Sequence, residues 1–191
     1  MKVFDEGTGP AIVVIPGVQG RWEWMMPALR ALSARCRVIS YSLGPAKTFD
    51  ELVAQVDRVL DERGVEAAAI CGVSFGGLIA AKYAAARPER TTAVVVVSTP
   101  SPAWTPSAQQ ARYLESPWLS TPAFIATSPG RMWPEIAAAI EGWPARFRFC
   151  AEHVGRIIAA PIVPAQMAGR MKLHPGLELR TDCAADRKSV V

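Results

Sequence analysis

One serine of the chain lies in a setting that could make it a nucleophile. Ser74 stands in the stretch ICGVSFGG, with Gly72 two positions before it and Gly76 two positions after it, so these residues fit the pattern G-x-S-x-G. A serine hydroxyl attacks a carbonyl carbon when a base takes its proton, and the attack creates a negatively charged tetrahedral intermediate. The pattern therefore predicts acyl-transfer chemistry, which needs a base and hydrogen-bond donors close to Ser74.

The elements on either side of the motif support this interpretation. The apolar run EAAAICGVS predicts a buried strand before the serine, and FGGLIAAKYAAAR predicts a helix that ends before Pro88. A sharp strand-to-helix turn needs small residues beside the serine, and it places Ser74 at a helix N-terminus, where free N–H groups favour developing negative charge. A phosphate-binding loop is the competing interpretation, but GVSFGG lacks both the G-x-G-x-x-G spacing and the phosphate-binding lysine.

Strand-like and helix-like segments alternate up to about Ser98. The apolar runs AIVVIPG, CRVISYSL and TTAVVVVS predict further strands. One helix is predicted from Trp24 to Leu32, and another in TFDELVAQVDRVLDERG, where Thr48 and Glu51 have the spacing of a capping box. This alternation predicts an α/β fold with a mostly parallel sheet flanked by helices.

The character of the sequence changes after Thr99. The segment PSPAWTPSAQQARYLESPWLSTPAF is rich in Pro, Ser and Trp, and the helical pattern that follows is broken by prolines. We therefore expect residues 1–99 to form the N-terminal part of a sheet domain and residues 100–175 to form a helical cap. Residues 176–191 are expected to begin a C-terminal part of the sheet domain that the chain otherwise lacks.

The strand, the G-x-S-x-G turn and the helix together resemble the nucleophile elbow of the α/β-hydrolase family. The resemblance covers residues 1–98 as the core and, more loosely, residues 100–183 as a cap. It implies that Ser74 is the nucleophile and that the turn depends on its two flanking glycines. It also implies an oxyanion hole made of the backbone N–H groups of Val18 and Phe75.

The loop that supplies Val18, IPGVQG, departs from the family in one respect. Family members often carry His-Gly where this chain has Pro16-Gly17, but proline need not disable a hole that is built from main-chain donors. Two groups of side chains can be interpreted in two ways. They could line a substrate pocket, or they could pack within their own layer of the structure. The first group follows the loop and comprises Arg21, Trp22, Trp24 and Met25, and the second lies in the predicted cap and comprises Trp104, Trp118, Trp133, Phe147 and Phe149.

The histidines of the chain do not match the position of the family's catalytic histidine. His153 lies inside the predicted cap and His174 lies in MKLHPGL, before any further strand, so we expect cap or surface roles for both. No carboxylate follows the last clear strand, and Asp182 and Asp186 come with no following strand to position them. The resemblance therefore implies a chain without the catalytic acid and base, and with little or no hydrolase activity.

We interpret this pattern as a chain that stops before the remaining strands of the family's sheet. Residues 186–191, DRKSVV, match the translation of a common sequencing-adapter stretch, so native sequence is expected to end near Ala185. The nucleotide sequence tests this hypothesis. In such a chain the strand TAVVVV would form an apolar sheet edge, which is a predicted aggregation site.

Composition narrows the class of partner. Half of the 191 residues are apolar and a fifth are charged, as in ordinary globular proteins, and the net charge of +4 is spread without a basic run that would favour nucleic acid. The N-terminus MKVFDEGTGP lacks the features of a signal peptide, and no apolar run is long enough to span a membrane, so we expect a cytoplasmic protein. Neither a metal site nor a disulfide framework is expected from the widely separated Cys36, Cys71, Cys150 and Cys183.

These features favour a cofactor-free hydrolase that acts on a small ester, lactone or related carbonyl substrate. The alternative is a hydrolase-like module that binds a small molecule in the cap without chemistry. A nucleotide-binding α/β domain is a weaker alternative. The sequence leaves the oligomeric state and the identity of the substrate open.

Overall fold

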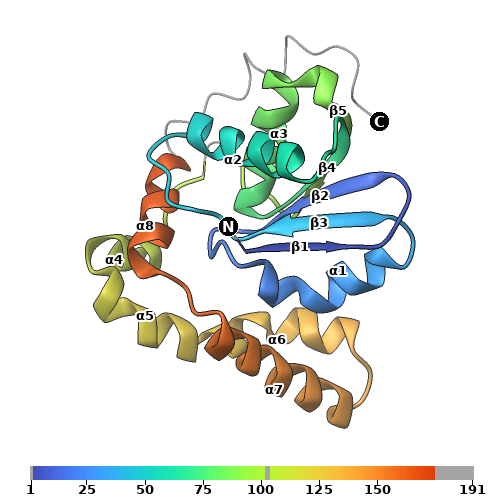
Figure 1. The fold of residues 1–191 in the computed structure, drawn as a ribbon. Coiled ribbons are helices and arrows are strands. Elements are labelled where there is room, and N and C mark those ends of the chain that lie inside the picture. Colours follow the sequence, from blue (N-terminus) through green and yellow to red (C-terminus); the bar gives the residue numbers. More distant parts are fainter. Residues whose placement is uncertain (1, 102–103, 175–191) are drawn as a thin grey trace.

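The computed structural model describes residues 2–101 and 104–174, which form a five-stranded sheet surrounded by helices (Figure 1). Four strands run parallel, and β1 is antiparallel to β3. In chain order the strands are β1 (Val3–Glu6), β2 (Ala11–Ile15), β3 (Arg37–Tyr41), β4 (Ala68–Val73) and β5 (Thr91–Val97), and their order in the sheet is β1-β3-β2-β4-β5. The predicted parallel strands are confirmed, whereas β1 is too short and too polar for its sequence to reveal it.

Helices cover both faces of the sheet, as predicted. The helices of this part are the 3₁₀ turn η1 (Trp22–Met25), α1 (Met26–Ser33), α2 (Phe49–Glu62), α3 (Phe75–Ala86) and the 3₁₀ turn η2 (Pro88–Arg90). Helices α2 and α3 lie on one side and α1 on the other (Figure 1). The larger apolar cluster, under α2 and α3, includes Ile15, Ile39, Leu52, Ile70 and Ile79, and the smaller one, under η1 and α1, includes Phe4, Val14, Leu29, Val38 and Cys71.

The predicted start of α2 is confirmed with one difference in its cap. The Glu51 N–H donates to the Thr48 hydroxyl oxygen over 3.2 Å, as the capping pattern requires. The Glu51 carboxylate, however, accepts from the N–H of Lys47 at 2.7 Å instead of the N–H of Thr48. Both bonds satisfy backbone donors at the helix start, so the helix begins where the sequence predicts.

Five helices follow the sheet in the described part of the chain, and we call them the cap. They are α4 (Ala108–Glu115), α5 (Pro117–Ala126), α6 (Ser128–Ala139), α7 (Trp143–Ala159) and α8 (Pro164–Leu173). Helix α8 lies beside α4, and α6 and α7 form a layer below α1 (Figure 1). The predicted domain boundaries remain predictions, and residues 176–191, with the hypothesis about the last six, lie outside the described residues.

Strand β5 forms the edge of the sheet within the described residues, as predicted. It pairs only with β4 there. The side chains of Val95, Val96 and Val97 are 43%, 52% and 42% exposed. A row of half-exposed valines on a strand with one free edge among the described residues is the feature that the aggregation prediction requires.

The described residues provide neither a membrane-spanning helix nor a cluster of metal-binding side chains. None of the helices in residues 2–101 and 104–174 has the length and apolar character needed to cross a membrane. The same residues contain no group of three or more His, Cys, Asp or Glu side chains placed to hold a metal ion. Cys36, Cys71 and Cys150 are free thiols, and Cys183 lies outside the described residues.

Candidate active site

The serine of the motif sits on a strained turn between β4 and α3. Ser74 has φ +54° and ψ −124°, a conformation that residues with a side chain rarely adopt. Three hydrogen bonds fix the turn: the Ser74 N–H donates to Val97 O at 2.8 Å, and Ser74 O accepts from the Gly77 N–H at 2.9 Å and from the Thr99 hydroxyl at 3.1 Å. The turn therefore places Ser74 at the carboxyl end of β4 and at the N-terminus of α3.

The two glycines of the motif are required by the closeness of neighbouring backbone. A Cβ on Gly72 would collide with the carbonyl oxygen of Gly76, and a Cβ on Gly76 would collide with the carbonyl oxygen of Ile15. The helix start thus packs directly against the ends of β4 and β2. This close approach is the physical reason for small residues on both sides of the serine.

The loop after β2 lies against the serine. A Cβ on Gly17 would stand 3.5 Å from the Ser74 Cβ, and Gly17 O accepts from the Gly20 N–H at 2.8 Å, which closes the loop into a turn. Val18 lines the same cavity as Ser74. Phe75 is the first residue of α3, where backbone N–H groups have no acceptor within the helix. The two residues predicted to supply the oxyanion hole, Val18 and Phe75, therefore line one cavity with Ser74.

A buried arginine from the cap supports this loop. The Arg170 guanidinium on α8 donates to Val18 O at 2.9 Å, to Leu43 O at 2.6 Å and to Gly44 O at 3.3 Å, and the side chain is 2% exposed. Burial, with a smaller contribution from Arg21, lowers the Arg170 pKa to about 10, so the group stays charged at neutral pH. Charge-assisted hydrogen bonds from Arg170 therefore hold the carbonyl of Val18, a residue that lines the cavity.

Ser74 opens onto a cavity of about 230 Å³ that the core and the cap share. The core contributes Val18, Ser74, Phe75, Ser98, Thr99 and Pro100, and the cap side contributes Trp104, Gln110, Met171 and His174. The core residues come from the loops after β2, β4 and β5, at the carboxyl ends of parallel strands, where open α/β sheets bind ligands. A serine, a helix N-terminus and a second loop amide around one cavity are suited to acyl transfer.

The sequence matches a family model described as the alpha/beta hydrolase fold over residues 10–124. The chain belongs to the α/β-hydrolase family. The match includes the loop with Val18, the Ser74 turn and the first cap helices. The predicted family and fold class are therefore confirmed.

Two curated relatives match about half of the chain. A protein of Azorhizobium caulinodans named carbamate hydrolase RutD is 33% identical over 102 residues, which are 48% of this chain and 38% of that protein. Polyketide synthase ThaQ of Burkholderia thailandensis is 38% identical over 107 residues, which are 51% of this chain and 5% of that protein. The chain thus spans well under half the length of either relative.

Solved α/β-hydrolase structures share the fold over nearly the whole chain. A hydrolase from Pseudomonas aeruginosa has a TM-score of 0.72 at 20% identity, covering 98% of this chain and 73% of that one. An enol-lactonase from Burkholderia xenovorans has a TM-score of 0.70 at 19% identity, covering 95% and 72%. At these identities the likeness concerns the fold.

The two histidines occupy different places in the cap. His153 lies on α7 beside a second, apolar cavity of about 260 Å³, whereas His174, directly after α8, lines the Ser74 cavity and is 2% exposed. Of the two expected roles, cap or surface, His174 therefore has the cap position, because the docking of α8 buries it. The described lining of the Ser74 cavity contains no carboxylate.

Three side chains after the Gly17–Val18 loop pack rather than line the Ser74 cavity, and Arg21 lines a different cavity. Trp22 rests on Phe4 with ring centroids 5.5 Å apart, and Met25 joins the same apolar cluster. The Trp24 indole N–H donates to Ala160 O of the cap at 2.9 Å. The packing interpretation is therefore correct for these three side chains, and Trp24 additionally attaches the cap.

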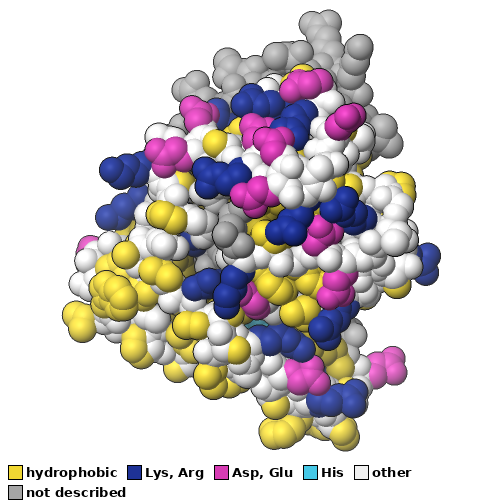
Figure 2. Space-filling view, in the orientation of Figure 1, with side chains coloured by type: hydrophobic (Ala, Val, Ile, Leu, Met, Phe, Trp, Pro, Cys, Tyr) yellow, Lys and Arg dark blue, Asp and Glu magenta, His cyan; other side chains and the backbone are white. Residues whose placement is uncertain are grey.

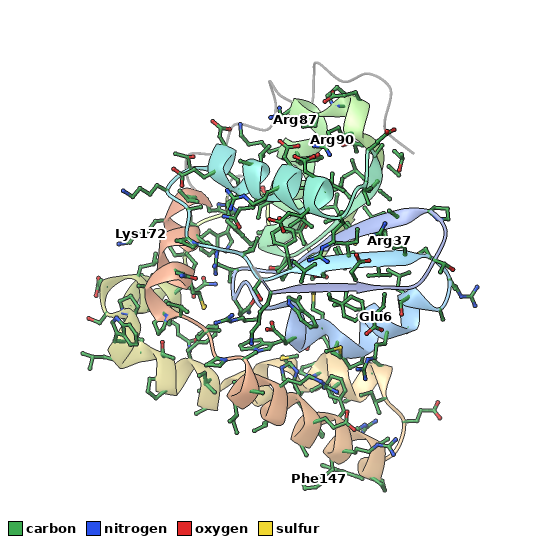
Figure 3. The ribbon with its side chains drawn as sticks, in the orientation of Figure 1. Glu6, Arg37, Arg87, Arg90, Phe147 and Lys172 are labelled. Atoms are coloured by element: carbon green, nitrogen blue, oxygen red, sulfur yellow. The ribbon has the colours of Figure 1, made fainter. Side chains whose placement is uncertain are left out.

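The cap aromatics separate into three groups. Trp104 lines the Ser74 cavity, so a roof role is correct for this residue. Phe149 borders the second cavity, and Trp133 packs on a neighbouring tryptophan. Trp118 and Phe147 are 69% and 75% exposed, so neither interpretation is correct for them; Figure 3 shows Phe147 at the outer edge of α7.

Two residues of the site escape sequence reasoning. Arg170 and His174 follow the buried Met167 by three and seven positions, on the same face of α8 as Met171. A charged or polar residue within an otherwise apolar helical stripe was the available signal. Such a signal marks a buried polar group but does not say which distant carbonyl or cavity it meets.

Proposed function

We propose that the chain carries the nucleophile and oxyanion hole of a serine hydrolase that acts on a small ester, lactone or related carbonyl substrate. The observation that supports this most strongly is the strained Ser74 turn facing a cavity with the Gly17–Val18 loop beside it. Strain of this kind costs about 1–3 kcal/mol and is retained where the conformation serves a function.

The proposed reaction proceeds through an acyl-enzyme. Ser74 Oγ attacks the substrate carbonyl carbon as its proton passes to a base, and the carbonyl oxygen becomes an oxyanion that accepts from the Val18 and Phe75 N–H groups. Collapse of this intermediate breaks the bond to the leaving alcohol, which takes up a proton. Water then attacks the acyl-enzyme in the same way, releasing the acid and restoring the serine hydroxyl.

The acid–base pair is not assigned among the described residues. The described lining of the cavity has no carboxylate, and its one imidazole, His174, has no carboxylate partner there. We infer that a base and its orienting acid lie outside residues 2–101 and 104–174. Without them, the oxyanion hole and binding leave about 10³–10⁴-fold acceleration over water.

The size of the cavity favours short substrates. About 230 Å³ is below the usual range for sites that hold drug-sized ligands, roughly 300–1,000 Å³. Trp104, Met171 and Val18 provide apolar walls that suit a short acyl chain or a small ring. One relative is named for carbamate hydrolysis, and a carbamate carbonyl is open to the same attack as an ester carbonyl.

Labelling with a fluorophosphonate probe tests the proposal. We expect slow phosphonylation of Ser74, located by peptide mass spectrometry, and its complete loss in Ser74→Ala. The matched control is Ser98→Ala, because Ser98 lines the same cavity and also has a positive φ, +48°. Labelling that is absent at Ser74, or that moves to Ser98, contradicts the assignment of the nucleophile.

A non-catalytic binding module is the second candidate. The absence of a carboxylate from the described lining is the observation that favours it. Such a module would bind small esters in the cavity, as detected by shifts of the Val18 and Phe75 amide signals, while Ser74 remains unlabelled by the phosphonate. Binding together with labelling at Ser74 contradicts it.

A further inference from the structure

A buried imidazole of the cap has no hydrogen-bond partner in the described part of the chain. His174 follows α8 and is 2% exposed, and neither Nδ1 nor Nε2 reaches a donor or acceptor there. Buried polar side chains are nearly always hydrogen-bonded, and an unpaired one is costly to keep. A histidine buried in this way needs a partner that the described residues do not supply.

The surroundings of His174 indicate that a hydrogen-bond partner would reach it from the Ser74 cavity. The His174 ring meets Trp104 edge-on, with centroids 4.8 Å apart and planes at 63°, and both side chains line the cavity with Met171. Ser74 lines the same cavity from the core side. The serine and the unpartnered imidazole therefore share one space of about 230 Å³, which a small ligand would fill.

The charge state of the imidazole restricts the ligand chemistry. Burial lowers the pKa of His174, so the ring is neutral at pH 7. A neutral imidazole has one N–H donor and one lone pair, and it offers no charge to attract a carboxylate. It suits a hydroxyl, which can both donate and accept, or a keto oxygen, which accepts.

We propose that His174 is a specificity-determining residue that hydrogen-bonds a hydroxyl or keto oxygen of a short, uncharged ester or lactone held beside Ser74. The proposal rests on the proposed function for the identity of the reacting carbonyl, but the binding contact itself does not require turnover. The core thus supplies the nucleophile, and the cap supplies the group that selects polar over purely apolar substrates.

Two matched esters and one non-reactive variant test the contact. Methyl 3-hydroxybutyrate carries a hydroxyl that methyl butyrate lacks, and Ser74→Ala allows binding without acylation. Because the chain has two histidines, selective labelling of histidine gives two ring signals that His153→Gln and His174→Gln assign. We expect the hydroxy ester to shift the His174 signal saturably and to leave His153, which lines the other cavity, unchanged.

Affinity then separates a binding contact from a structural role. Binding is measured through the Phe75 amide signal in the Ser74→Ala protein. In this protein, His174→Leu should lower the affinity for the hydroxy ester about tenfold, or about 1.4 kcal/mol. The affinity for methyl butyrate should change less than about threefold. His174→Gln keeps a donor and an acceptor and should recover part of the loss. The thermal melting of each variant establishes that it is folded.

Several results overturn the inference. Equal weakening of both esters by His174→Leu, no weakening of either, or no binding of the hydroxy ester to the folded Ser74→Ala protein would each contradict it. Phosphonate labelling of the unmodified chain is measured separately. Labelled Ser74 without hydroxy-ester selectivity refutes the contact alone, and selectivity without labelling refutes the nucleophile alone.

Discussion

The core and the cap differ in how completely they bury apolar side chains. Val13, Ile39 and Ile70 in the sheet are fully buried, at 0% exposure. Within α5 and α7, all of whose residues are described, none is buried, and Phe147 and Ile158 are 75% and 74% exposed. Figure 2 shows the hydrophobic side chains that gather on the outer side of these cap helices.

This difference suggests that the core provides most of the stability and that the cap mainly completes the cavity. Burial of apolar surface is the main source of stability, so we expect α5 and α7 to gain less stability from packing than the sheet does. The strained serine turn lies where neighbouring backbone leaves no room for a Cβ on either glycine of the motif. The cap is attached through polar contacts, such as the Arg21 Nε–H bond to Pro161 O at 2.8 Å. It is also attached through an apolar cluster, in which Val18 and Trp24 pack against α4 and α8, and it contributes side chains to the cavity.

The largest contrast is expected from one substitution made in both regions. Gly76→Ala should lower the free energy of unfolding by at least about 3 kcal/mol, because its Cβ collides with the backbone of β2. Gly155→Ala on α7 meets no atom within 4 Å and should raise it by up to about 1 kcal/mol, since alanine favours helix. Urea denaturation followed by circular dichroism measures both, and equal effects would break the comparison.

A pair of isoleucines sharpens the contrast in burial. Ile70→Ala removes a side chain that is 0% exposed and should cost about 2–5 kcal/mol. Ile158→Ala removes one that is 74% exposed and should stay within about 0.5 kcal/mol. The same denaturation experiment applies. A large loss from Ile158→Ala would show that the outer side of α7 is covered by something else in solution.

The hydrogen bonds from Arg170 on α8 to carbonyls of the core connect the two regions, and a substitution of Arg170 tests their contribution. Arg170→Met removes the hydrogen bonds to Val18 O and Leu43 O and should cost about 1.5–3 kcal/mol. It should also slow phosphonylation of Ser74, because the loop that contains Val18 loses its support. Lys172→Met is the control on the same helix, since Lys172 is exposed and points away from the sheet (Figure 3). Unchanged labelling in Arg170→Met would leave Arg170 with a purely structural role.

The smallest expected effect is on pH dependence, and it concerns the cap. Burial lowers the pKa of His174, and burial together with the charge of Arg156 lowers that of His153. Below about pH 6.5 the unfolded histidines bind protons that the folded ones resist, so stability is full above that pH and falls as the pH drops. Between pH 7.5 and 5.5 we therefore expect the free energy of unfolding to fall, with His174 contributing to the loss.

The measurement for this effect is urea denaturation at a series of pH values, followed by tryptophan fluorescence. Most tryptophans of the chain lie in the cap segment, so fluorescence reports mainly on that region. His174→Gln should reduce the dependence on pH. A dependence that persists unchanged in this variant would assign it to other groups.

The parts of the molecule that the sequence predicted are those with local causes. The Ser74 turn was predictable because its two glycines and the strand and helix beside them lie within a short pattern, although hydrogen bonds with Val97 and Thr99 complete it. The positions of His174 and Trp118 depend on how α8 and α5 dock. No residue within a few positions of either one indicates how these helices dock.

The hydrogen bonds around the site also differ in how far apart their partners lie along the chain. Thr99, whose hydroxyl bonds Ser74 O, lies 25 positions after the serine, whereas Arg170 lies 152 positions after Val18, whose carbonyl it holds. During synthesis the serine turn can therefore form while most of the cap is still untranslated. The Gly17–Val18 loop can acquire its arginine only after α8 has left the ribosome, so we expect the serine turn to form before the loop beside it is fixed.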